Sequence, residues 1–429
     1  MRFASALSEH PIATTAVGEV VGQVLDHVGY APDLAVLFVT SPQAEALEAV
    51  ADTVSELLRP RALIGCVAES VVGTGREVEH RSAMSLWAGN VGTLVPVELE
   101  SVGSTGPIVG WPDEIDFEPA ALLLVGDPFS FPVLPFFEWL ASTHPGLPVV
   151  GGMASGGRGP GSSRLVIGGR VRTNGAVGVL LGPSARMSSV VSQGCRPIGF
   201  PWMVTKAEGN VIHQLAGKPP LERLEALAQG QLSPADVALV NQGGLQLGKV
   251  IDEHKATFGR GDFRIIGIMG ADRRTGSIAL ADLVETGNTV QFHLRDAEAA
   301  DEDLRHTLSS HPAGGGRGRD PAGGGRGLDP AGGGRGRRAE AALVFTCNGR
   351  GTRLFPHPHH DASVVAELLG DIPTGGFFAA GELGPVGGKN FLHSFTASIA
   401  LFEEDPAIDE PPPNPGESLG EGPVPPGSG

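Results

Sequence analysis

The chain has 429 residues, more than a single ordinary hydrophobic core accommodates, so we expect two domains. Its formal net charge of −17 argues against non-specific binding to nucleic acids and to anionic membranes, because their phosphate groups would be repelled. Its three cysteines, Cys66, Cys195 and Cys347, are too few and too scattered for a disulfide framework, which favours a cytoplasmic protein.

The N-terminus and the apolar runs predict neither export nor a membrane span. Glu9, His10 and Glu19 interrupt the segment in which a signal peptide would need continuous apolar residues. The longest apolar candidate is broken at Asp127 and Pro128, short of the roughly 18 residues that a membrane span requires. We therefore expect no membrane partner.

One pattern occurs three times: an apolar strand, a helix, a Gly-x-x-Ala element that enters a glycine-rich loop, and a further strand. The opening strands lie at 33–41, 120–128 and 341–351, and the helices follow at 43–58, 132–142 and 361–370. The matching glycines and alanines are Gly65 and Ala68, Gly151 and Ala154, and Gly376 and Ala379. Each copy has the form of a βαβ unit whose glycines allow close backbone approach.

Residues 261–297 differ in character, because short apolar runs alternate there with turn signals at 272–276 and 285–287. This pattern is typical of a β-meander. We therefore expect an α/β protein, with two mixed α/β domains built from repeated strand–helix–Gly-loop–strand units and a β-meander in the second half.

Two segments have almost nothing to bury and are expected to be disordered. The first, 309–338, carries three copies of a nine-residue unit that begins PAGGGRG, and the second is the Pro-rich acidic tail 404–429. We interpret the arginine-containing insert as a solvated linker, with contact to RNA or an acidic partner as the alternative. The predicted domains are 1–218 and 219–403, the second interrupted by the insert.

Five stretches in order along the chain resemble the FIST family. They are "IGCVAESVVGTGREVE", "VVGGMASGG", "GDFRIIGIMGAD" with the strands after it, "FTCNGRGTRLF" and "GFFAAGELGPVGGKNFLHSFTASIALF". The resemblance implies paired FIST N and FIST C domains in a cytoplasmic sensory or signal-transduction protein that binds a small ligand, with amino acids or related metabolites as candidates. It resembles a bacterial stand-alone member, since no F-box-like segment and no fused output domain are visible. A separate signalling output protein would be needed.

The glycine-rich loops carry the candidate ligand-binding residues. Arg350, between Gly349 and Gly351, has the planar fork that captures a carboxylate, and Glu382 after Gly381 could receive an ammonium group. The alternative for Arg350 is a salt bridge to Glu382 or to another acid. The other candidate contacts are Cys66, Arg76, Glu77, Cys347 and His393.

Other functions are weighed against this prediction. A hydrolase or transferase with Cys347 or Cys66 as its nucleophile is the enzymatic alternative, although "CNGRG" lacks the spacing of a nucleophile elbow. A protein-interaction scaffold without any ligand is the third hypothesis. "PHPHHD" at 356–361 could bind a metal, but a pre-helix loop in which Asp361 caps the next helix is the preferred interpretation. We predict no catalytic residue, no metal and no cofactor.

Overall fold

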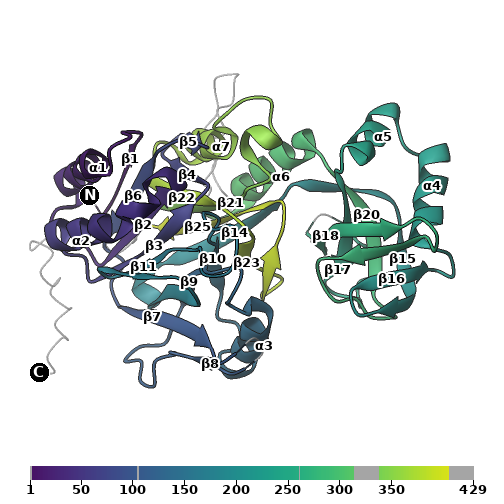
Figure 1. Cartoon of the computed structure of the whole chain (residues 1–429), viewed down its shortest axis with the longest axis horizontal. Helices are drawn as coiled ribbons and strands as arrows, with labels where there is room; N and C mark the ends of the chain where they lie inside the picture. Colours follow the sequence, from purple (N-terminus) through teal and green to yellow (C-terminus); the bar gives the residue numbers. More distant parts are fainter. Residues whose placement is uncertain (1, 104–105, 260, 314–337, 405–429) are drawn as a thin grey trace, which may run out of the picture.

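The computed structural model describes residues 2–103, 106–259, 261–313 and 338–404. Figure 1 shows a body of three β-sheets with helices around it, and a smaller barrel that projects from one side. In the described part of the chain, none of the helices has the length and apolar character needed to cross a membrane. Residues 314–337 of the predicted insert, and the tail from residue 405, lie outside the described residues.

The first sheet contains the first predicted repeat. Its strands, in spatial order, are β1 (Phe3–Ser8), β6 (Met84–Gly89), β2 (Leu34–Thr40), β3 (Ala62–Ala68), β11 (Leu165–Ile167) and β12 (Arg170–Arg172). Helices α1 (Ala13–Val28) and α2 (Leu47–Leu58) bury their apolar faces on its outer side.

The second sheet contains the second repeat. Its strands, in spatial order, are β24 (Lys389–His393), β23 (Glu382–Val386), β10 (Val149–Met153), β9 (Ala121–Gly126), β13 (Ala176–Leu181), β7 (Leu94–Ser101) and β8 (Ile108–Val109). Helix α3 (Val133–Thr143) covers its outer face with Phe136 and Leu140.

The third sheet contains the third repeat. Its strands, in spatial order, are β14 (Met187–Gln193), β25 (Thr396–Glu403), β21 (Ala339–Cys347), β22 (Thr374–Ala379), β4 (Ser70–Gly73) and β5 (Arg76–Glu79). Helices α6 (Ala297–Ser310) and α7 (His360–Leu369) pack on its outer face. The inner faces of the three sheets share one apolar core, in which Phe38, Phe345 and Phe377 meet.

The three units are alike and exchange their hairpins. In each, the two strands joined by a helix run parallel, as β2 with β3, β9 with β10 and β21 with β22. The hairpin that follows leaves its own sheet: β4 pairs with β22, β11 with β3, and β23 with β10. Each unit therefore completes the sheet of another, so segments far apart in the sequence form one body.

The matched glycines are explained by close contact within the parallel pairs. A Cβ at Gly65 or Gly151 would lie 1.8 Å from the carbonyl oxygen of Leu37 or Leu124, and one at Gly376 would lie 2.0 Å from that of Val344. No side chain fits at these distances, since the backbone of the neighbouring strand cannot yield as a flexible side chain can. The Gly-x-x-Ala elements thus lie in β3 and β22 and, in the second unit, in β10 with Ala154 directly after it, and the predicted loops follow them.

The barrel is an insertion between β14 and α6. It is closed by β15 (Cys195–Glu208), β16 (Val211–Leu215), β19 (Ser277–Leu280), β18 (Phe263–Asp272), β17 (Leu245–Val250) and β20 (Thr289–Arg295), in this spatial order, and carries α4 (Pro220–Gly230) and α5 (Pro234–Asn241). The strands of the predicted meander are β18, β19 and β20. The first two form a hairpin, while β20 pairs with β17 and β15 to close the barrel.

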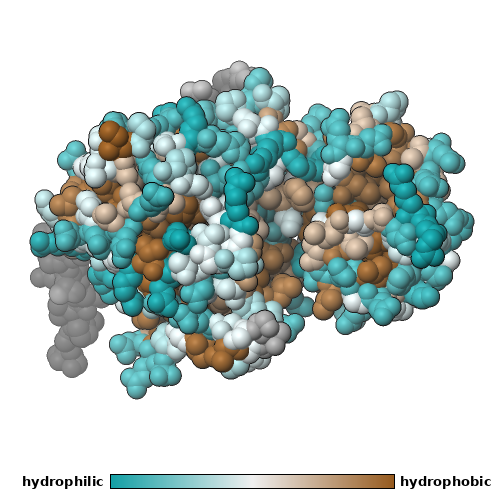
Figure 2. Space-filling model, in the orientation of Figure 1, coloured by the Kyte–Doolittle hydropathy of each residue, from teal (hydrophilic) through white to brown (hydrophobic). Residues whose placement is uncertain are grey.

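Several large apolar side chains are exposed on the barrel, namely Phe200, Met203, Met269 and Leu283. Figure 2 shows apolar surface on the barrel among polar side chains. The boundary predicted at 218 and 219 falls between β16 and α4. The division into domains 1–218 and 219–403 stays a prediction.

Candidate functional site

The loop that follows β21 lies at the carboxyl end of the parallel pair β21 and β22. Its backbone is fixed by hydrogen bonds from Asn348 N to the Ala379 oxygen and from Arg350 N to the Cys347 oxygen. Gly351 has a φ of 57°, and a Cβ there would lie 2.7 Å from Glu79 and Phe378. This loop, 347–355, therefore needs its second glycine for both conformation and space.

Arg350 is fully buried and forms a two-pronged ion pair with Asp361. Its Nε and Nη2 atoms donate to the two carboxylate oxygens over 2.8 and 2.7 Å. Burial opposes ionisation of Asp361, but the guanidinium outweighs it and holds the pKa of Asp361 well below its usual range. The Arg350 fork is thus occupied by an acid other than Glu382, and Nη1 has no hydrogen-bond partner among the described residues.

Glu382 faces the same loop from β23. Its Oε2 accepts hydrogen bonds from the Thr396 hydroxyl over 2.8 Å and from the Thr396 backbone over 3.1 Å. Burial raises its pKa to about 8, although the Thr396 hydrogen bonds oppose this shift. Its neighbour Cys347 has a thiol whose pKa is raised by burial and, secondarily, by the charge of Glu382. Cys347 is therefore a neutral thiol beside a carboxyl group that is largely protonated at neutral pH.

Glu77 reaches this cluster from the first unit, because its hairpin has joined the third sheet. Its Oε1 accepts a hydrogen bond of 3.0 Å from Ala362 N in the first turn of α7. Burial, followed by the charge of Asp361, raises the pKa of Glu77 to about 8. The structure thus brings four predicted residues into one buried cluster: Glu77, Cys347, Arg350 and Glu382.

The remaining predicted residues lie elsewhere or act through their backbone. Cys66 is buried in the shared apolar core, and Arg76 is half exposed and paired with Glu9 on the surface. His393 is buried opposite Glu382, where burial lowers its pKa to about 4. The carbonyl oxygens of Gly349 and Gly381 accept hydrogen bonds from Arg295 and from Met153 N.

A cavity of about 500 Å³ opens between α6 and α7, beside this cluster. Phe355, Pro356, Pro358 and Val364 form its apolar walls, and polar groups from α6 stand at one side. A volume of this size with mainly apolar walls and a few polar groups is typical of a small-molecule site.

His360 connects the cavity to the buried ion pair. Its ring stacks on Phe355 with centroids 3.4 Å apart, and Phe355 in turn lies against the Arg350 guanidinium at 5.1 Å. The two ring nitrogens of His360 lie 2.9 Å from Asp361 Oδ1 and 2.9 Å from Asp301 Oδ1. His360 therefore contacts both the cavity and the acid that pairs with Arg350.

Asp301 and Arg305 complete the polar side of the cavity. Arg305 Nε lies 3.0 Å from both oxygens of Asp301, and Arg305 Nη1 lies 2.8 Å from Glu367. The sequence reasoning missed these two residues, together with Phe355 and the bridging role of His360. The four-residue spacing of Asp301 and Arg305 on one helix face could be seen in the sequence, but the packing of α6 against α7 could not.

The histidines of "PHPHHD" have separate roles. His357 lines the cavity, His359 Nδ1 accepts a hydrogen bond from Glu77 N, and His360 bridges the two carboxylates. Within the described ranges, no three side chains of metal-binding type are grouped so that they could hold an ion. The interpretation of Asp361 as the helix cap is wrong, because the cap position of α7 is His359 and Asp361 lies in the first turn, where its carboxylate binds Arg350.

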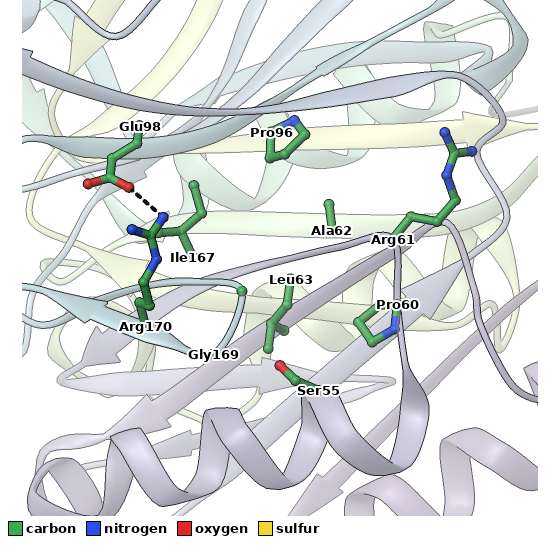
Figure 3. A pocket seen from close by; sticks show the side chains of 11 residues that line it. Ser55, Pro60, Arg61, Ala62, Leu63, Pro96, Glu98, Ile167, Gly169 and Arg170 are labelled. Atoms are coloured by element: carbon green, nitrogen blue, oxygen red, sulfur yellow. Dashed lines mark hydrogen bonds and ion pairs between the residues drawn. The ribbon is translucent and has the colours of Figure 1, made fainter.

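A second cavity, of about 360 Å³, lies between α2, the start of β3, the β11–β12 turn and β7 (Figure 3). Its charged groups are paired, Arg170 with Glu98 over 3.1 Å and Arg61 with Asp33 over 3.0 Å, as Arg305 is with Asp301 in the first cavity. None of the predicted site residues lines either cavity. The cavity between α6 and α7 is the better candidate because His360 and Phe355 in its wall contact the Asp361–Arg350 pair.

Comparison with known proteins identifies the family to which the chain belongs. Residues 33–218 match the model of the FIST N domain, and residues 222–385 match that of the FIST C domain. An uncharacterized protein of Mycobacterium bovis is 43% identical over 408 residues, which cover 94% of this chain and 100% of the relative. One from Mycobacterium tuberculosis is 43% identical over 412 residues, with the same coverage. The chain therefore belongs to the FIST family.

Proposed function

We propose that this chain is a ligand-sensing protein of signal transduction, and that its ligand binds in the cavity between α6 and α7. FIST domains are associated with signal transduction and small-ligand sensing. The observation that carries the proposal is the position of His360, which forms part of the cavity wall and contacts Asp361 at 2.9 Å behind it. A ligand there would act on the Arg350 pair without displacing it.

The lining of the cavity favours an amino acid or a related metabolite with an apolar side chain. A ligand ammonium group that displaces Arg305 would pair with Asp301, and the released Arg305 guanidinium would receive the ligand carboxylate. Phe355, Pro356 and Pro358 offer apolar surface to the rest of the ligand. These opposite charges take the place that the sequence prediction assigned to Arg350 and Glu382.

The buried residues have a supporting role in this proposal. Arg350 and Glu382 have 0% exposed surface, so a ligand in the cavity would not touch them. Arg350 positions Asp361, and Asp361 positions His360. We also propose a cytoplasmic location, which the free cysteines and the net charge of −17 support. A separate protein would provide the signalling output.

A thermal-shift screen tests the cavity. The wild type is heated with each of the common amino acids, with dipeptides and with organic acids, and a ligand at one hundred times its Kd adds about 2.7 kcal/mol to the free energy of unfolding. Asp301→Asn should weaken the shift, and Ser363→Phe should abolish it by filling the cavity. Ser309→Phe, on an exposed position of α6, is the matched control.

Two results would overturn the proposal. One is a wild type whose melting temperature no compound raises. The other is a ligand that shifts Ser363→Phe as much as it shifts Ser309→Phe, because that ligand would bind outside the cavity.

A further inference from the structure

Phe395, in the turn between β24 and β25, has an unusual backbone conformation. Its φ is 61°, in the left-handed region that an aromatic residue rarely adopts. Glycine would adopt this conformation without strain. A strained residue persists only where its surroundings hold it, and such residues concentrate at switch regions and binding sites. We therefore expect the aromatic ring of Phe395 to make contacts that compensate for this strain.

The ring of Phe395 contacts both the loop 347–355 and the barrel. A Cβ at Gly349 would lie 2.9 Å from the ring, so the loop passes directly over it. On the other side the ring packs against the apolar cluster that contains Cys195 and Phe263 of the barrel. Phe395 is thus wedged between the loop beside the candidate cavity and the base of the barrel.

The barrel is joined to the body by a narrow neck of two chain segments. One passes through Gly194 between β14 and β15, and the other through Asp296 between β20 and α6. The two segments are tied by a hydrogen bond of 3.3 Å from Asp296 N to the Gly194 oxygen. Figure 1 shows the barrel on one side of the body, and β18 of the barrel also contacts the body through Phe263, whose oxygen accepts a hydrogen bond of 2.6 Å from Gln193.

Arg295, the last residue of β20, ties the neck to the same loop. Its Nη2 donates to the Gly349 oxygen over 2.6 Å and to the Arg353 oxygen over 2.8 Å. Its guanidinium also lies over the Phe395 ring at 5.3 Å. The loop, the strained phenylalanine and the neck therefore meet in one set of contacts.

We propose that Arg295, Phe395 and Gly349 form a latch that couples the loop 347–355 to the orientation of the barrel. Phe355 at the end of this loop lines the cavity, so ligand binding would move the loop, release or tighten the latch and turn the barrel. The barrel is then the moving element, and its exposed apolar side chains are the surface that a protein partner would bind. The inference rests on the proposed function for its trigger, whereas the latch itself belongs to the ligand-free protein.

Hydrogen exchange measured by mass spectrometry on the ligand-free full chain tests the latch. Phe395→Gly removes the ring contacts and replaces them with a residue that keeps this backbone conformation without strain, so easier opening of the neck would result from the lost ring alone. We expect roughly tenfold faster exchange in the neck peptides around 194 and 296 and in the loop 347–355, with unchanged exchange in β2 and β3.

Phe391→Ala is the matched control. Phe391 lies on β24 and contacts the barrel through Arg264 at 5.9 Å, outside the latch. Its loss should raise exchange around Arg264 and leave the neck unchanged. Arg295→Met is a second latch variant, in case Phe395→Gly fails to fold, and it should raise exchange in the neck and the loop as well.

The latch is wrong if neither latch variant changes exchange in the neck, or if Phe391→Ala raises it by the same factor. Because these measurements contain no ligand, that result would leave the cavity proposal standing. Conversely, a failed ligand screen would not alter the exchange of the neck.

Discussion

The carboxyl ends of β9 and β21 occupy matching places in the second and third units, yet they differ in chemistry. Asp127 follows β9 where Cys347 ends β21, each three residues after the residue paired with the matched glycine. Asp127 is satisfied by two neutral hydroxyl groups, those of Ser130 at 2.5 Å and Ser163 at 2.6 Å. One backbone frame therefore carries a closed polar network in the second unit.

The end of β21 is not closed in this way. Arg350 stands three residues after Cys347, as Ser130 stands three residues after Asp127. Around it, Nη1 of Arg350, Oε1 of Glu382 and Oε2 of Glu77 are buried without a hydrogen-bond partner in the described chain. Buried polar atoms of this kind require an explanation, and a functional role is one. The second and third units therefore share one backbone arrangement, and the buried charged site is found in the third.

Removal of Arg350 should cause the largest difference in stability between variants at the two strand ends. Arg350→Met leaves the buried Asp361 carboxylate without its guanidinium partner, and we expect the free energy of unfolding in urea to fall by about 3 to 5 kcal/mol. Ser130→Ala, at the matching place, removes the hydrogen bond that the hydroxyl donates to Asp127 and the one that it accepts from Gly175 N, and should cost about 1 to 3 kcal/mol.

The double variant Arg350→Met/Asp361→Leu checks the cause of this loss. Replacing both partners of a buried pair by apolar side chains is often close to neutral, so the double variant should recover most of the lost stability. Equal losses for Arg350→Met and Ser130→Ala would show that the two strand ends do not differ energetically.

Glu382 gives the third unit a pH dependence of known sign. Its pKa is raised from 4.5 to about 8 on folding, so its contribution to the free energy of unfolding is full below the unfolded value and is lost as the pH rises through about 8. Glu382→Gln removes this loss. Relative to the wild type, the variant should gain on the order of 3 kcal/mol between about pH 5 and about pH 8.

Urea unfolding at several pH values measures this gain, and Glu56→Gln on the exposed face of α2 is the control. A gain that does not change with pH would mean that Glu382 is ionised in the folded protein. Glu77 has a pKa raised in the same direction, so part of the pH dependence should persist in Glu382→Gln.

Local patterns predicted much of the fold, because each repeat has a strand, a helix and a glycine whose spacing reflects short-range geometry. The matched residues Gly65, Gly151 and Gly376 indeed occupy one structural position. The exchange of hairpins was not predictable, since a hairpin such as β4 and β5 satisfies its own pattern equally well in any sheet. The sequence also left open whether Arg350 pairs with Glu382 or with another acid, because the packing of the sheets decides which carboxylate lies beside it.

The candidate site was predictable only where its residues share one stretch of chain. Arg350 and Asp361 lie close in sequence and meet in the structure, whereas Asp301 comes from a helix on the far side of the insert. His360 was not among the predicted ligand-binding residues. Its contact with Asp301 depends on how α6 and α7 pack, which no local pattern contains.

Alanine variants of the three matched glycines test whether the units share one backbone arrangement. Alanine at Gly65, Gly151 or Gly376 places its Cβ within 2.0 Å of a carbonyl oxygen, and each variant should lose roughly 1 to 3 kcal/mol of unfolding free energy. Gly22→Ala on α1, where nothing lies within 4 Å of the added carbon, should instead gain up to about 1 kcal/mol. Widely different losses among the three variants, measured in urea, would argue against a common frame.

The smallest effect is expected at Cys347, which distinguishes ligand sensing from thiol chemistry. Cys347 is the most accessible of the three cysteines, but burial raises the pKa of its thiol above the usual value, and the thiolate is the reactive form. Iodoacetamide at neutral pH should therefore modify the native protein at least roughly tenfold more slowly than free cysteine. Protein unfolded in urea provides the control, because all three thiols should react there. Rapid modification of Cys347 alone would restore the hydrolase or transferase hypothesis, since it would show that this thiol is ionised at neutral pH despite its burial beside Glu382.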